Sequence, residues 1–511
     1  MNVVVNMEEK QTYKNVYVNI LAFIIQFLTN FFIAPIIVEH VGAAAYGFVN
    51  IANDFVSYAA ILGSIFNSVA ARFIANEFYR KNYEKANNYF NSLIMANAIL
   101  SLVICSVAFI LIFNLEYILI VPESLVTDVK ITFVLVFVSY VITLVTMVYS
   151  TSVFVVNRTD IQGIRNVLKS ILALAVTILL FIVCSVKIYW IAFGTVVSTI
   201  IIAVMNISLT HKYTPMLKLN IGYIKKKYAL EVAKSGGWMA ITSLSAALLR
   251  GVDLTLANIM LGDYEMGLLS VARTMPNNML SVIGTLAPIF TPVFIACYAS
   301  GKQEALIKNI NRSIDIMSMI LFVPISIFIV YSSDFYKLWQ DSLGHEEVYI
   351  VSVLSIVSVI QSYFDATTAT LAQVSVVVNK LKIPVLVSLG CGIISLGIEI
   401  ILLKFTNLGI YAIVLPTTII MVMRYIFFNP IYASYCLNIS IKSFLGVVVK
   451  RWGAIPILVL SMILVKCKFQ ISNWGTLILN ICVCYIVGEI IMVMLYKISS
   501  VKKIIGLKNE K

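Results

Sequence analysis

Charged residues are scarce in this chain: Lys, Arg, Asp and Glu make up only 12% of its 511 residues. An ordinary soluble domain carries about 25%. Apolar runs of about 20 residues recur along the sequence, and each is long enough to cross a bilayer as a helix. A membrane β-barrel would show alternating segments of about 10 residues instead. The composition therefore predicts an all-α integral membrane protein.

Histidine and cysteine are also few and scattered. The three His stand far apart, and no Cys spacing fits a zinc site. Cys482 and Cys484 would point to different faces of one helix. We expect no metal site, no disulfide framework and no cofactor. The net charge of +13 would suit nucleic acid, but the distribution of basic residues described next explains it without such a partner.

About fourteen transmembrane helices are predicted, and their count sets the orientation of the chain. The loops on the side of the two termini carry 28 of the 37 basic residues, among them Arg158, Arg165 and Lys169 between spans four and five. Because cytoplasmic loops are enriched in Lys and Arg, both termini are predicted to lie in the cytoplasm. Val16 to Val38 exceeds the 7–15 apolar residues of a signal peptide, so we expect it to remain as the first span. The approximate span cores are 16–38, 48–70, 89–113, 127–149, 166–186, 188–208, 236–260, 267–296, 313–332, 348–375, 384–404, 408–433, 448–466 and 474–496.

The two halves of the chain resemble each other at a constant offset. VGAAAYGFVNIAN (41–53) aligns with LGDYEMGLLSVAR (261–273), which pairs Gly42 with Gly262 and Gly47 with Gly267. Spans one and seven both run outward from the cytoplasm, so the repeats are predicted to be parallel, and such transporters bind substrate between the halves. The predicted parts are an N-terminal six-helix lobe (1–210), a cytoplasmic linker (211–233), a C-terminal six-helix lobe (234–435), and helices 13 and 14 with a basic cytoplasmic tail (436–511).

Arg250 and Arg273 lie inside predicted spans, on either side of a short turn. An intramembrane charge costs about 2.5–3.5 kcal/mol on insertion scales, so such a residue indicates a function. Arginine binds phosphate with a fork of donors. Two arginines facing a central cavity would attract an anion, and a diphosphate in particular. The structural alternative is a salt bridge between Arg250 and Asp253, which share one helix face.

Amide side chains occupy matching positions in the first half, where the repeat pairs Asn30 with Arg250 and Asn53 with Arg273. Asn30 and Asn53 belong to polar stripes along spans one and two, and hydrogen bonding between helices is the alternative role for these stripes. In the second half, Asn277 follows Pro276, which is expected to kink the helix, so Asn277 either satisfies the freed carbonyls or reaches the cavity. We predict that Asn30, Asn53 and Asn277 help to bind the substrate.

Four intramembrane carboxylates are candidates for ion coupling. Any of them can bind Na⁺ or H⁺ and link transport to an ion gradient, and the sequence does not choose among them. They are Asp54, Asp253, Asp365 and Glu399.

The segment NILAFIIQFLTNFFIAPIIVEHVGAAAYGFVNIANDF (19–55) and its echo LGDYEMGLLSVARTM (261–275) resemble bacterial polysaccharide flippases. These are the O-antigen and capsule repeat-unit flippases of the multidrug/oligosaccharidyl-lipid/polysaccharide exporter superfamily. In that family, the first helix ends in a Pro and a hydrophobic stretch. A turn of the form Gly-x4-Gly with a Tyr follows, here Gly42, Tyr46 and Gly47, and a basic residue ends span two, here Arg72. The resemblance implies a V-shaped transporter of two parallel six-helix repeats plus two extra helices.

The resemblance also implies a function. It suggests a flippase, not an enzyme, that moves polyprenyl-diphosphate-linked oligosaccharide from the cytoplasmic to the outer leaflet by alternating access coupled to an ion gradient. The product would feed O-antigen lipopolysaccharide or capsule assembly. Implied partners are this substrate, membrane lipids, Na⁺ or H⁺, and polysaccharide polymerase and chain-length proteins. The implied location is the bacterial cell (inner) membrane.

Two other functions compete with this one. An ion-coupled multidrug or metabolite antiporter of the same superfamily would use carboxylates in its cavity, and the intramembrane carboxylates here outnumber the arginines. A membrane polymerase or glycosyltransferase usually carries a large outer loop or a cytoplasmic catalytic module. The longest predicted outer loop runs only from Ser333 to Glu347, which disfavours an enzyme.

Overall fold

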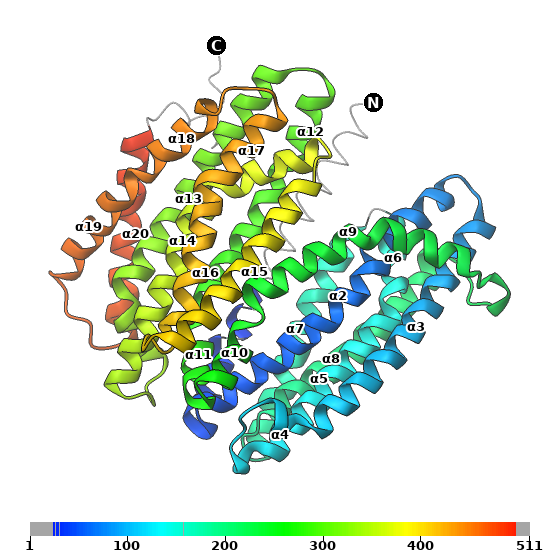
Figure 1. Ribbon diagram of the computed structural model, residues 1–511, viewed down its shortest axis with the longest axis horizontal. Helices are drawn as coiled ribbons and strands as arrows, with labels where there is room; N and C mark the ends of the chain where they lie inside the picture. Colours follow the sequence, from blue (N-terminus) through cyan, green and yellow to red (C-terminus); the bar gives the residue numbers. More distant parts are fainter. Residues whose placement is uncertain (1–23, 26, 30, 157, 497–511) are drawn as a thin grey trace. The chain divides into compact units, whose positions relative to one another are not determined.

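In the computed structural model of the chain, the described residues are 24–496 except 26, 30 and 157. Within them every regular element is a helix (Figure 1), which confirms the predicted all-α membrane fold. Among the described residues, 12 helices are long and apolar enough to cross a membrane, or 13 if one bent pair counts as a single span. Each predicted span from the second to the last overlaps one of them. The first, 16–38, lies partly outside the described residues, which include an apolar helix at Phe27–Val41.

The chain divides into two compact units. The first unit comprises residues 1–271 and 385–397, and the second comprises 272–384 and 398–511. The predicted lobe boundaries at 210 and 234 stay a prediction. The helices of the first unit are α2 (Ala43–Tyr79), α3 (Tyr83–Phe113), α5 (Val126–Thr146), α6 (Thr151–Val155), α7 (Thr159–Val183), α8 (Tyr189–Tyr213), α9 (Lys226–Arg250) and α10 (Asp253–Met260), besides the short α4 (Leu115–Ile118).

The second unit contains the helices that follow. Two helices, α11 (Asp263–Leu286) and α15 (Lys382–Phe405), contribute residues to both units. The others are α12 (Thr291–Ala299), α13 (Gln303–Trp339), α14 (His345–Val377), α16 (Tyr411–Met423), a π-turn at Arg424–Phe428, α17 (Asn429–Cys436), α18 (Lys442–Trp452), α19 (Ala454–Lys466) and α20 (Trp474–Tyr496).

The internal repeat is visible in the backbone. Gly42 and Gly262 both adopt positive φ, 101° and 121°, and each directly precedes a helix. Lys81 and Gly301, which are separated by the same offset, have φ of 58° and 68°. Glycine adopts such angles freely, whereas other residues rarely do. The sequence offset therefore corresponds to two copies of one helix–turn–helix segment.

The two copies also touch each other at equivalent residues. A Cβ built on Gly47 would lie 3.3 Å from the Cα atom of Gly267. The Asn50 Nδ2 donates to the Ser270 Oγ at 2.6 Å, and these two residues are related by the repeat as well. The crossing of α2 with the start of α11 therefore joins residues that the repeat makes equivalent.

The polar connection between α8 and α9 packs on the end of α3. The Asn87 side chain donates to the Met216 carbonyl at 2.8 Å and accepts from the Lys218 amide at 2.7 Å. The Asn91 side chain likewise donates to the Lys218 carbonyl and accepts from the Asn220 amide. The backbone of the predicted linker is thus held on α3 by two asparagine side chains.

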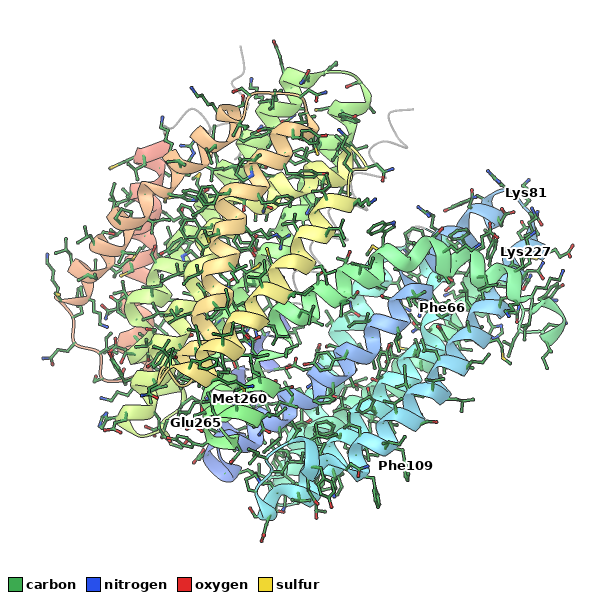
Figure 2. The ribbon with its side chains drawn as sticks, viewed as in Figure 1. Phe66, Lys81, Phe109, Lys227, Met260 and Glu265 are labelled. Carbon is green, nitrogen blue, oxygen red and sulfur yellow. The ribbon has the colours of Figure 1, made fainter. Side chains whose placement is uncertain are left out.

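Labelled side chains mark the two ends of the first unit. Lys81 and Lys227 lie at one end, and Met260 and Glu265 lie at the opposite end (Figure 2). Phe109 on α3 points away from the helices of this unit and is 72% exposed. The sequence pattern assigns the lysine end to the cytoplasm, and an exposed phenylalanine in an apolar helix suits contact with lipid.

The last two spans are attached to α13. From α19, the Lys466 Nζ lies 2.5 Å from the Asp334 Oδ2 and donates to the Val330 carbonyl at 2.9 Å. From α20, Asn480 accepts from the Tyr331 hydroxyl at 3.4 Å. The predicted extra pair of helices therefore belongs to the second unit.

Candidate substrate and ion sites

The predicted site residues fall in both units. Asn53, Asp54, Arg250 and Asp253 belong to the first unit, and Arg273, Asn277, Asp365 and Glu399 belong to the second. Asn30 lies outside the described residues, and so does the side chain of Arg250, which is the last residue of α9.

A break in a membrane span organises the first group. The segments Lys226–Leu249 and Asp253–Met260 form one bent pair with an angle of 40°. The Tyr58 hydroxyl of α2 donates to the Gly251 carbonyl within the break. A Cβ on Gly251 would lie 3.2 Å from the Tyr58 ring. The missing side chain at Gly251 therefore allows α2 to approach the break closely.

Two of the predicted carboxylates lie near this contact. Asp253 is 1% exposed and is the first residue of α10, whereas Asp54 is half-buried one turn before Tyr58. Both carboxylates lie close enough to the Tyr58 hydroxyl to interact with it electrostatically. The structure thus brings together two ion-coupling candidates that are far apart in the sequence.

Asn53 is exposed, and its side chain donates to the Val49 carbonyl of its own helix at 2.9 Å. The contact with the second repeat is made by its neighbour Asn50 instead, through Ser270. No sequence signal separates these two amides, because both lie in the same polar stretch of α2.

In the second unit, Arg273 is half-buried on α11 and Asn277 is exposed one turn later. Residues four apart share a helix face. The preceding carbonyl, of Ala272, accepts hydrogen bonds from Ser355 at 2.8 Å and from Tyr336 at 3.2 Å. These two buried hydroxyls on α14 and α13 hold the backbone that carries Arg273, and the sequence did not identify them.

Glu399 is 1% exposed on α15, and its Oε1 accepts from the Thr417 hydroxyl of α16 at 2.7 Å. A hydroxyl next to a buried carboxylate supplies the oxygen ligands that hard cations prefer. Asp365, by contrast, is half-buried on α14. Gln361 and Ser358 precede Asp365 on the same face of α14. Their side chains donate hydrogen bonds to carbonyls of α14 itself and not to another helix.

Arg165 and Lys169, which the sequence analysis assigned to the connection between spans four and five, are helical. They lie within α7, which begins at Thr159 and contains a candidate membrane span at Ile161–Val183. The helix begins before the predicted apolar core at 166 and continues through polar residues such as Gln162. Their assignment to the cytoplasmic side stays a prediction.

An ion pair inside the second unit was also missed. The Arg451 guanidinium on α18 lies 2.6 Å from the Asp315 carboxylate on α13. No cluster of three or more potential metal ligands occurs within residues 24–496 as far as they are described.

Comparisons with known proteins agree with this architecture. A family model described as "Polysaccharide biosynthesis protein" matches residues 12–296. The chain is also 24% identical over 488 residues to the uncharacterized membrane protein EpsK of Bacillus subtilis (strain 168). That similarity covers 94% of this chain and 95% of EpsK.

Two solved structures share the fold. A multidrug resistance MATE family transporter of the MOP superfamily, in an inward-facing conformation, has a TM-score of 0.69 at 12% identity. The match covers 83% of this chain and 99% of that one. The lipid II flippase MurJ, in an inward closed conformation, has a TM-score of 0.67 at 13% identity and covers 94% of this chain and 99% of its own.

Proposed function

The chain belongs to the polysaccharide biosynthesis protein family, and from that membership we propose that it is a lipid flippase. It moves polyprenyl-diphosphate-linked oligosaccharide repeat units from the cytoplasmic to the outer leaflet of the bacterial cell membrane. Alternating access, coupled to a gradient of Na⁺ or H⁺, drives the movement. The observation that carries this proposal is the family match, which spans more than half of the chain.

The extent of the structural likeness supports a lipid substrate. The lipid II flippase matches 94% of this chain, whereas the multidrug transporter matches 83%. In this proposal, the last two spans offer additional surface for a polyprenyl tail outside the six-helix repeats.

The diphosphate binds Arg273 and Asn277 in this proposal. Arg273 keeps its charge at every accessible pH and offers a fork of donors to phosphate oxygens. The hydroxyls of Ser355 and Tyr336 hold the backbone beside it, and preorganised ligands bind more tightly. Arg250, Asn30 and Asn53 remain predicted ligands of the same substrate.

The first experiment measures flipping in proteoliposomes. Purified protein is reconstituted with a fluorescent polyprenyl-diphosphate oligosaccharide, and accessibility to an impermeant reagent is followed under an imposed ion gradient. We expect Arg273→Ala to lower the flipping rate at least about tenfold, because a charge-assisted contact is lost. Arg273→Lys keeps the charge and should retain part of the activity.

Arg80→Ala is the matched control, since Arg80 is a 68% exposed residue paired only with Glu77 of its own helix turn. Flipping that survives in Arg273→Ala would keep the function and remove Arg273 from the site. Absence of flipping by the unmodified protein would contradict the proposed function itself.

Ion coupling is assigned to Glu399 with Thr417, and to Asp54 with Asp253. We expect Glu399→Gln to flip its substrate at a rate that no longer responds to the ion gradient, because an amide neither carries charge nor exchanges a proton. The rate with and without the gradient is the measurement. A gradient response equal to that of the unmodified protein would exclude Glu399.

Ion-coupled drug or metabolite antiport is the second candidate function, favoured by the likeness to the multidrug transporter and by the carboxylates near Tyr58. Efflux of a cationic dye would support it. Arg273→Ala should not reduce cation efflux, so this variant separates the two functions. Polysaccharide polymerase and chain-length proteins are proposed as partners only if the protein is a flippase, and not if it is an antiporter.

A further inference from the structure

One helix of the first unit has two contrasting long faces. On α7, the exposed residues Ile164, Ile171 and Ile178 recur at a heptad spacing, as expected of a lipid-facing stripe. Arg165 and Lys169 lie on the other side of the helix, where Gln162 and Asn166 are exposed polar residues. The isoleucine side suits contact with lipid, whereas the other side carries amides near the start of the helix and packs on Gly194 of α8 further along.

The two cations lie in the N-terminal part of α7. With a rise of 1.5 Å per residue, Arg165 is about 9 Å and Lys169 about 15 Å from the first residue of the helix. They are one turn apart, so their side chains lie on one face. Arg165 is almost fully buried, and a buried positive charge is costly unless an anion or water compensates it.

Among the described residues, no carboxylate forms an ion pair with either cation. Arg165 is 3% exposed, and its Nη1 donates to the neutral Asn206 amide of α8. Its Nε has no hydrogen-bond partner among the described residues.

Another basic residue of the same unit shows the contrast. Lys187, in the connection after α7, lies 2.9 Å from the Asp128 carboxylate. That hydrogen bond raises the pKa of Lys187 above its ordinary value. Lys187 is thus neutralised by a carboxylate, whereas Arg165 contacts a neutral amide.

We propose that Arg165 and Lys169 form an anion-binding site on the side of α7 opposite its exposed isoleucines. The ligand is a phosphate or carboxylate group of the lipid-linked substrate, so this inference rests on the proposed function. Arg165 offers its unused Nε–H as a directed donor, and Lys169 adds a mobile charge one turn deeper. The group comes either from the diphosphate or from an acidic sugar. Arg165 and Lys169 belong to the first unit, whereas Arg273 belongs to the second.

A purely structural role makes a different prediction. If Arg165 served only to tie α7 to α8, removal of Asn206 would be as harmful as removal of Arg165. The tie also leaves Lys169 unexplained, because Lys169 has no polar contact with a described residue. Variants that remove the tie and variants that remove the charge therefore separate the two roles.

The test is a binding measurement on purified protein in detergent, by native mass spectrometry. Three probes are used: polyprenyl diphosphate without sugar, the same lipid with a neutral oligosaccharide, and the same lipid with one uronic acid. We expect Lys169→Gln and Arg165→Gln to weaken binding at least about tenfold. Lys169→Arg, Asn206→Ala and the control Lys187→Gln should bind like the unmodified protein, and melting temperatures verify folding.

The three probes identify the source of the anion. Loss with all three lipids places the diphosphate in the site, and loss confined to the uronic acid probe places the sugar there. Unchanged binding in both Gln variants overturns the site and leaves the proposed function intact. Asn206→Ala that binds as weakly as Arg165→Gln also overturns it in favour of the tie. An unmodified protein that binds none of the lipids overturns the proposed function together with the site.

Discussion

Asp315 on α13 and Arg451 on α18 form an ion pair with 2.6 Å between carboxylate and guanidinium. Their side chains are only 19% and 17% exposed, so both charges are largely removed from solvent. The energy of such a pair is dominated by what happens when one partner is lost, because the remaining charge stays buried. The same reasoning makes a buried cation without a carboxylate, such as Arg165, informative about function.

Arg451→Ala is expected to destabilise the protein by about 3–5 kcal/mol, the usual loss when a buried pair is broken from one side. Thermal unfolding in detergent measures the change. The control is Arg80→Ala, which removes an exposed i,i+3 pair worth less than about 1 kcal/mol. Equal unfolding temperatures for the two variants would show that the Asp315 pair contributes nothing to stability.

Among the helices, α2 and α11 depend on glycine where they cross. A Cβ on Gly267 would lie 2.6 Å from the Ala43 carbonyl carbon and from the Ala44 amide nitrogen, which are backbone atoms and cannot rotate away. The crossing also carries the hydrogen bond between Asn50 and Ser270. The repeat pairs Gly47 with Gly267, so one small residue from each copy makes the close approach possible.

Gly267→Ala should therefore reduce stability by about 1–3 kcal/mol through overpacking. Gly284→Ala in the same helix is the matched control, because a Cβ there meets nothing within 4 Å. Alanine also favours a helix over glycine by about 1 kcal/mol, so the control should be neutral or slightly stabilised. A stabilised Gly267→Ala would mean that the two helices do not approach as closely as described.

For the whole molecule, family membership and shared fold confirm the resemblance to polysaccharide flippases at the level of the family. The orientation of the termini stays a prediction from the basic loops. In the first unit, Lys81 and Lys227 share one end (Figure 2), as two loops assigned to the cytoplasm should.

Labelling of single cysteines tests this orientation. In a chain whose eight Cys are replaced, Asp341→Cys lies in the exposed connection after α13 and Lys227→Cys lies at the start of α9. We expect an impermeant maleimide to label position 341 in intact cells, and position 227 only after the membrane is permeabilised. The reverse pattern would invert the topology and place both termini outside.

Hydropathy by itself determined the spans, because an apolar run must cross the bilayer whatever its neighbours are. The constant offset between the halves likewise predicted the repeat, since turn glycines recur wherever the backbone needs positive φ. Only the tertiary structure decided which side chains meet. Tyr58 contacts Gly251 from a distant part of the chain, and Arg451 finds Asp315 on another helix. The tertiary structure also showed that Arg165 of α7 contacts Asn206 of α8. The partner of a charge depends on how helices pack, and the spacing of residues along one helix does not encode that packing.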